Sequence, residues 1–337
     1  MTLQAAIYGL SGERLSPDER DFFRDADPAG YILFRRNCVD RAQMKALTDQ
    51  LRSLSGRDDL PILIDQEGGR VARMRPPHWP EFPAAEAFAR LYDKAPMSAI
   101  EAARANAGAI ASLLREVGVN VDCLPLLDVR QPGATDIIGD RSLGEAPMQV
   151  AALGRAVLDG LRQSGVVGVI KHMPGHGRAL VDSHLELPRV AADEAMLEAD
   201  LEPFRTLRAA PMGMTAHVVF EAWDKDRPGT LSPIVIGEIV RGRIGFDGFL
   251  MTDDIGMHAL SGGFDERARL ALEAGCDAAL HCSGEMSEMV AVASAAGPLG
   301  DKGRERLERA MATIAGGPAG PGYDALAGKR DQLLAYA

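Results

Sequence analysis

Short apolar runs alternate with longer amphipathic stretches along this chain, and the alternation predicts strands followed by helices. Runs that are almost wholly apolar are typical of strands covered on both faces of a parallel sheet. Such runs occur at residues 5–9, 31–34, 61–64, 119–121, 166–170, 212–219, 249–252 and 278–282. Eight strands that alternate with helices favour a closed barrel over an open sheet.

The stretches between these runs carry helix signals. Ser16, Pro17 and Glu19 predict an N-cap, a first helical residue and a capping box, and Asp40 predicts another N-cap. We therefore predict an α/β protein with a single (β/α)8 TIM-type barrel over residues 1–300. Residues 301–337 are expected to form a helical tail packed on the barrel.

Composition excludes several classes of protein. The 337 residues are 46% hydrophobic and 25% charged, which is typical of a globular domain. A net charge of −11 argues against nucleic-acid binding. No run is long enough to span a membrane and no secretory signal is visible. We expect a cytoplasmic monomer that acts on a small-molecule substrate and needs neither cofactor nor metal.

The most informative stretch follows the run at 166–170. Lys171 and His172 come where that strand is expected to end, and Pro174 and Gly175 exclude a helix after it. Three of the seven histidines fall between residues 172 and 184. Ionisable groups beyond a buried strand are where α/β barrels place their chemistry.

Other charged residues also follow predicted strands, and in a barrel these positions share one rim. Taken singly, an aspartate there is often a helix cap and an arginine is often a surface residue. Their convergence predicts an active site instead. The candidates are Asp65, Arg73, Arg141, Lys171, His172 and Asp253.

Two kinds of chemistry remain open from the residues alone. An irregular metal site is one alternative, although the proline and glycine after His172 break the helix of a two-histidine zinc motif. Carboxylate chemistry aided by a histidine is the other. Asp182 and His184, two residues apart in an extended loop, point to one side, so Asp182 could fix the tautomer of His184. With Asp253 held by a strand, this pair would suit glycoside hydrolysis with retention.

The motifs together resemble glycoside hydrolase family 3, and within it the bacterial β-N-acetylglucosaminidases of peptidoglycan recycling. The resemblance runs to about residue 290. The motifs are Asp65-Gln-Glu-Gly-Gly-Arg-Val-Ala-Arg73, Gly139-Asp-Arg-Ser-Leu143, Lys171-His-Met-Pro-Gly-His-Gly177, Asp182-Ser-His184 and Thr252-Asp-Asp254. Members usually have Phe at positions 143 and 173 and Ser at 252, and none of these departures removes a catalytic group.

The resemblance implies a role for each candidate. Asp253 would be the covalent nucleophile, and His184 the acid/base, paired with Asp182 on a mobile loop. The residues implied to bind the N-acetylglucosamine (GlcNAc) unit are Asp65, Arg73, Arg141, Lys171 and His172. The implied substrate is GlcNAc-1,6-anhydro-N-acetylmuramic acid, with or without its peptide.

Three rival functions remain. A phosphorylase is one, because a neutral histidine would repel an incoming phosphate less than a glutamate would. A non-catalytic sugar-binding barrel is the second, although both Asp253 and His184 are present. A metal-dependent barrel hydrolase is the third.

Overall fold

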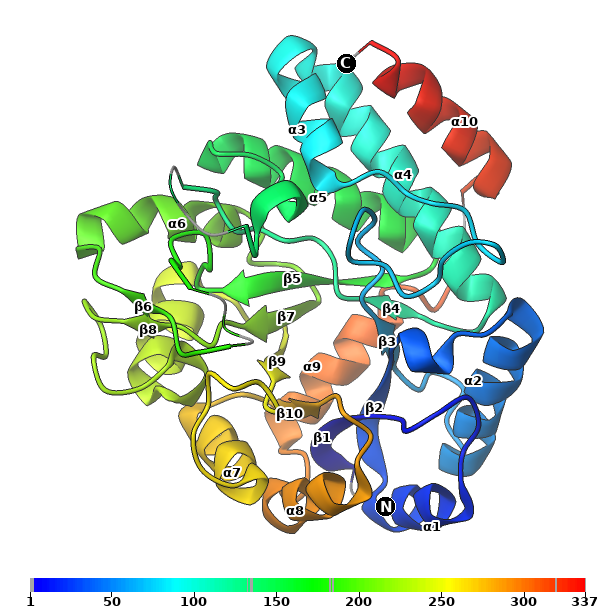
Figure 1. The fold of residues 1–337 in the computed structure, drawn as a ribbon, viewed down its shortest axis with the longest axis vertical. Coiled ribbons are helices and arrows are strands. Elements are labelled where there is room, and N and C mark those ends of the chain that lie inside the picture. Colours follow the sequence, from blue (N-terminus) through cyan, green and yellow to red (C-terminus); the bar gives the residue numbers. More distant parts are fainter. Residues whose placement is uncertain are drawn as a thin grey trace.

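The computed structural model describes residues 3–131, 133, 136–181, 183, 185–318 and 320–336. Within these residues, eight parallel strands close into a barrel with helices around it (Figure 1). The predicted TIM-type barrel is thus confirmed. The barrel strands are β1 (Gln4–Gly9), β2 (Pro28–Leu33), β3 (Ile62–Ile64), β4 (Val121–Asp122), β5 (Val167–Met173), β7 (Met212–Thr215), β9 (Phe249–Asp254) and β10 (Ala278–His281).

Helices follow most of the strands and form the outer layer. They are α1 (Pro17–Ala26), α2 (Arg41–Ser55), α3 (Ala85–Lys94), α4 (Pro96–Glu116), α5 (Pro147–Gln163), α6 (Glu194–Thr206), η4 (Val235–Ile244, of π type), α7 (Phe264–Ala274), α8 (Met286–Ala296), α9 (Asp301–Ala312) and α10 (Tyr323–Leu334). Short 3₁₀ turns are η1 (Arg35–Asn37), η2 (Gly139–Arg141) and η3 (Gly229–Leu231), and β6 (Arg189–Val190) pairs with β8 (Val219–Phe220) outside the barrel. No described helix is both long and apolar enough to cross a membrane.

The apolar strands divide their side chains between two cores. Along β3, Ile62 and Ile64 pack in the layer between strands and helices, whereas Leu63 points into the barrel. This is the two-residue period of a strand, and it explains why both faces must be apolar.

The C-terminal helices pack against different parts of the barrel. Leu307 and Met311 of α9 join the inner core at the end where the strands begin. The Arg306 guanidinium bonds Asp277, 2.9 Å away, and so ties α9 to the chain just before β10. Helix α10 lies along α4 (Figure 1). The division of the chain at residue 300 stays a prediction.

Candidate active site

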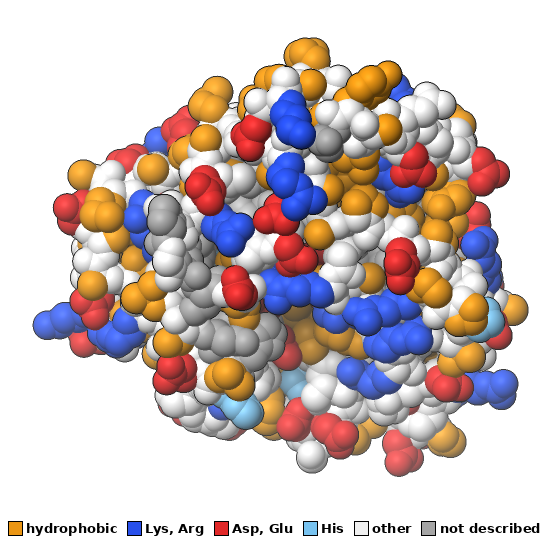
Figure 2. Space-filling view, turned by 45° about the horizontal axis from the view of Figure 1, so that its top comes forward, with side chains coloured by type: hydrophobic (Ala, Val, Ile, Leu, Met, Phe, Trp, Pro, Cys, Tyr) orange, Lys and Arg blue, Asp and Glu red, His pale blue; other side chains and the backbone are white. Residues whose placement is uncertain are grey.

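A pocket of about 240 Å³ opens at the carboxyl ends of the barrel strands. Figure 2 shows a hollow on this face, with Lys and Arg side chains gathered beside it. Six of the residues singled out from the sequence line the pocket, and they come from segments far apart in the chain. They are Asp65, Arg73, Arg141, Lys171, His172 and Asp253.

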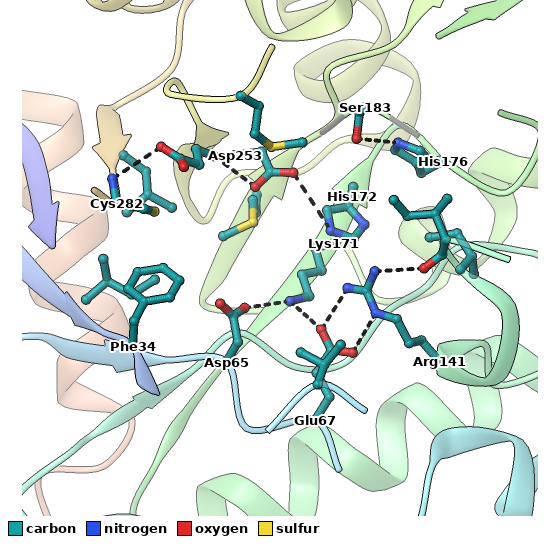
Figure 3. A pocket seen from close by; sticks show the side chains of 18 of the residues that line it. Phe34, Asp65, Glu67, Arg141, Lys171, His172, His176, Ser183, Asp253 and Cys282 are labelled. Carbon is teal, nitrogen blue, oxygen red and sulfur yellow. Dashed lines mark hydrogen bonds and ion pairs between the residues drawn. The ribbon is translucent and has the colours of Figure 1, made fainter. Parts of the chain in front are cut away.

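Charged side chains on one side of the pocket form a polar wall, with Lys171 at its centre and Asp65, Glu67, Arg73 and Arg141 around it. Its ammonium group is 2.9 Å from Asp65 Oδ1 and 2.8 Å from Glu67 Oε1 (Figure 3). Arg73 completes the pairing, with its guanidinium 3.1 Å from Asp65 Oδ2. Because β5 extends to Met173, Lys171 and His172 lie inside this strand rather than beyond its end. The strand thus fixes both side chains.

Glu67 is a member of this cluster that sequence reasoning missed. Arg141 donates two hydrogen bonds to the Glu67 carboxylate, of 2.8 and 2.9 Å, in the bidentate geometry of arginine–carboxylate pairs. Glu67 also contacts Lys171, so one buried acid holds both cations. A signal was available, because Glu67 stands two residues after Asp65.

The opposite charges keep one another ionised. Burial alone would raise the pKa of Asp65, but Lys171 and Arg73 lower this pKa well below its usual range. Burial would likewise raise the pKa of Glu67, and Lys171 with Arg141 lowers it. Burial would lower the pKa of Lys171, but the neighbouring carboxylates of Asp65 and Glu67 raise it. The pocket therefore presents fixed charges, which suit the hydroxyl and carbonyl groups of a polar ligand.

Asp253 stands on the other side of the pocket, near the end of β9. Its Oδ1 accepts a hydrogen bond of 2.8 Å from the Asp254 N–H, and its Oδ2 lies 4.0 Å from His172 Nε2. Burial would raise the pKa of Asp253, but His172 and His217 lower it. Asp253 is therefore an ionised carboxylate on a rigid strand, and its side chain is 20% exposed to the pocket.

Asp128, a second residue that sequence reasoning missed, orients the histidines. Its Oδ2 is 2.8 Å from His172 Nδ1, while its Oδ1 accepts the His176 N–H at 2.7 Å. Burial works to raise the pKa of Asp128, yet His172 and His176 lower it to about 2. An ionised Asp128 therefore holds the Nδ1–H tautomer of His172 and leaves its Nε2 facing Asp253.

Apolar and aromatic groups form the remaining walls. Phe34, Met214, Met257 and Leu280 line the pocket. The guanidinium of Arg73 lies 5.1 Å from the centre of the Phe34 ring, which is cation–π geometry. A few fixed polar groups among apolar walls are typical of a small-molecule site.

Comparison with known proteins agrees with this geometry. Residues 3–315 match the family described as the glycosyl hydrolase family 3 N-terminal domain. The chain belongs to this family. A β-hexosaminidase of Alkalilimnicola ehrlichii is 42% identical over 288 residues, which cover 84% of this chain and 82% of that protein. A β-hexosaminidase of Methylococcus capsulatus is 40% identical over 282 residues, or 82% of each chain.

A solved structure also resembles the whole barrel. NagZ from Neisseria gonorrhoeae, in complex with N-trifluoroacetyl-D-glucosamine, superposes with a TM-score of 0.86 at 31% identity. The alignment covers 100% of this chain and 97% of that one. The predicted family membership is confirmed.

The family 3 loop after β5 is described only in part. Asp182 and His184 lie outside the described residues, so the acid/base role of His184 and its pairing with Asp182 stay predictions. Between them, Ser183 Oγ is 3.2 Å from His176 Nε2, and Ser183 O accepts the Ala259 N–H at 3.3 Å. Within the described residues, no group of three or more His, Cys, Asp or Glu side chains is placed to share a metal ion.

Proposed function

We propose that the protein is a retaining exo-β-N-acetylglucosaminidase that removes terminal GlcNAc from muropeptides. The observation that carries the proposal is Asp253, an ionised and rigidly held carboxylate that faces a pocket of fixed charges in a family 3 barrel. At the coarser level, the protein is a glycoside hydrolase of the β-N-acetylhexosaminidase type, in agreement with its 35–42% identity to β-hexosaminidases.

In the first step, Asp253 attacks the anomeric carbon of the GlcNAc unit. A carboxylate oxygen bonds to C1 while the bond from C1 to the leaving oxygen breaks, and His184 gives that oxygen a proton. The Asp254 N–H at 2.8 Å and the nearby His172 keep the Asp253 carboxylate ionised and aimed into the pocket.

In the second step, the glycosyl ester is hydrolysed. His184, now neutral, takes a proton from water, and the water oxygen bonds to C1 as the ester bond to Asp253 breaks. Asp182 would hold the His184 ring in one tautomer and stabilise its protonated form. Retention of configuration follows from two displacements at the same carbon.

The polar wall would bind the sugar that is cleaved off. Asp65 accepts hydrogen bonds from hydroxyl groups, whereas Lys171, Arg73 and Arg141 donate to hydroxyl and carbonyl oxygens. His172, fixed by Asp128, donates or accepts at Nε2. The trifluoroacetyl-glucosamine bound to the gonococcal NagZ supports a 2-acylamino sugar as the ligand class.

The natural substrate of this account is GlcNAc-1,6-anhydro-N-acetylmuramic acid, with or without its peptide. We propose that the enzyme acts in the cytoplasm, where peptidoglycan fragments are recycled. Both points rest on the resemblance of the sequence motifs to the family 3 enzymes of peptidoglycan recycling.

Hydrolysis of an aryl β-N-acetylglucosaminide tests the proposal, with the matching aryl β-glucoside as the comparison. We expect the first to be cleaved at least about a hundredfold faster, as kcat/KM, because binding of the acetamido group adds about 3 kcal/mol. The assay is run with and without phosphate and with a chelator. GlcNAc 1-phosphate as the product would identify a phosphorylase, loss of activity with chelator a metal enzyme, and no cleavage a binding protein.

A further inference from the structure

The chain after β5 is fixed to α6 by a buried ion pair. Arg178 Nε lies 2.5 Å from Asp200 Oδ2, and Arg178 also donates to the carbonyl oxygen of Met196 at 3.0 Å. The side chains of Arg178 and Asp200 are only 15% and 8% exposed. Among the described residues, this burial is comparable with that of the Arg141–Glu67 pair in the pocket, whose side chains are 12% and 5% exposed.

Asp200 depends on Arg178 for its charge. Burial raises the pKa of Asp200 to about 6, and Arg178 opposes this rise. The other oxygen, Oδ1, is buried without a hydrogen-bond partner among the described residues. Gly175 passes so close that a Cβ there would lie 3.3 Å from Asp200 Cβ. The chain therefore contacts α6 at two positions, Gly175 and Arg178.

A second attachment follows five residues later. Ser183 bonds the Ala259 N–H through its carbonyl oxygen, and His176 through its hydroxyl. Five residues of chain span at most about 18 Å, so the attachment at Arg178 limits where Ser183 can lie. His184 is the next residue in the chain.

We propose that Arg178 and Asp200 are positioning residues for the acid/base histidine: their ion pair holds the chain that carries His184 at the pocket. The inference rests on the proposed function, in which His184 gives a proton to the leaving oxygen. The proposed sugar-binding groups Asp65, Arg73, Arg141 and Lys171 do not contact the pair, and His172 is held by Asp128. Loss of the pair should therefore spare sugar binding and impair proton transfer.

Leaving groups of different acidity separate these two effects. Dinitrophenolate leaves without a proton, whereas a methoxyphenolate needs the acid. Both are compared as kcat/KM, which reports the first displacement only. In Arg178→Ala we expect kcat/KM to fall at least tenfold for 4-methoxyphenyl β-GlcNAc and less than twofold for the 2,4-dinitrophenyl glycoside. The Kd of GlcNAc itself should change less than twofold.

Two further variants make the test decisive. Asp200→Asn keeps the shape of the side chain and removes its charge, so it tests the same prediction if Arg178→Ala fails to fold. It should lower kcat/KM for the methoxyphenyl glycoside more than for the dinitrophenyl glycoside. Arg189→Ala removes a pair that Arg189 makes with Glu221 at 3.0 Å near the same loop, and it should leave both rates unchanged.

The outcomes are distinguishable. Equal losses on the two substrates, or no loss, in a variant of an active enzyme would overturn the positioning role and leave the proposed function standing. A wild-type protein that cleaves neither glycoside would overturn the proposed function and this inference with it.

Discussion

Glu67 illustrates how one side chain can organise the charged groups of a pocket. It is buried, it holds Arg141 through two hydrogen bonds, and it shares Lys171 with Asp65. Without Glu67, the neighbouring cations Arg141 and Lys171 would lose the carboxylate that both contact, and Asp65 would pair only with Lys171 and Arg73. Its role is therefore to set the directions in which both cations point.

Glu67→Gln should accordingly weaken both folding and binding. Removing one partner of a buried charge cluster costs about 3–5 kcal/mol, so we expect a loss of this size in the urea-measured free energy of unfolding. KM for an aryl GlcNAc substrate should also rise. Glu116→Gln is the control, because its pair with Arg41 is about half exposed and such pairs contribute at most about 1 kcal/mol. Similar losses in the two variants would contradict the role given to Glu67.

His176 should make stability depend on pH. Burial and the neighbouring His172 lower the pKa of His176 to about 4, whereas a histidine in the unfolded chain titrates near 6.5. Between these values the unfolded state binds more protons, so this residue makes stability rise as the pH increases from about 4 to about 6.5.

The measurement is urea unfolding at several pH values in this window. His176→Gln should reduce the slope of unfolding free energy against pH, whereas His78→Gln, at an exposed position, should not. An unchanged slope in His176→Gln would show that His176 titrates normally in the folded protein.

At the scale of elements, the hydrophobic pattern predicted the barrel well. Each apolar run contributed a barrel strand, because a parallel strand buried on both faces has a distinct composition. The run at 212–219 is divided, since β7 ends at Thr215 and Val219 begins β8 outside the barrel. The caps at Ser16 and Asp40 are also confirmed. These signals are local, and local signals can be read from a sequence.

Elements whose stability comes from tertiary contacts escaped the sequence analysis. Helices α3 and α8 were not predicted, nor was the two-stranded β6–β8 sheet. Strand β5 is longer than predicted because its end pairs with β7, Met173 lying opposite Thr215. Asp128 was missed for a similar reason, since only folding brings it to His172 and His176.

Helix α9 should contribute strongly to stability because it completes the inner core. Leu307 is 5% exposed and packs with residues at the beginnings of the strands. Leu307→Ala should cost about 2–5 kcal/mol of unfolding free energy. Val290→Ala, at a position 51% exposed on α8, should change it by no more than about 0.5 kcal/mol. A similarly small change in Leu307→Ala would show that α9 is only loosely attached.

For the molecule as a whole, the barrel brings together charges that lie almost 190 residues apart. Asp65 directly follows β3 and Asp253 lies in β9, yet both line one pocket. The order of charged residues after strands predicted this convergence. The sequence order could not predict which charged groups contact one another, because these contacts depend on side-chain directions that are fixed only in the folded protein.

The overall charge and the charge of the pocket have different consequences. A net charge of −11 acts against polyanionic partners, while Arg73, Arg141 and Lys171 give the pocket its own cations. Local geometry therefore decides what the pocket binds.

The most direct test of the account is to trap the covalent intermediate on Asp253. A 2-deoxy-2-fluoro sugar with a good leaving group should form a glycosyl ester that persists, because the fluorine slows both displacements and the leaving group compensates only in the first. Mass spectrometry of a peptic digest should find the added sugar on the peptide that contains Asp253, and Asp253→Asn should remain unlabelled. A label on another residue, or no label together with strong inhibition by a thiazoline mimic of the acetamido intermediate, would contradict the assignment of Asp253 as the nucleophile.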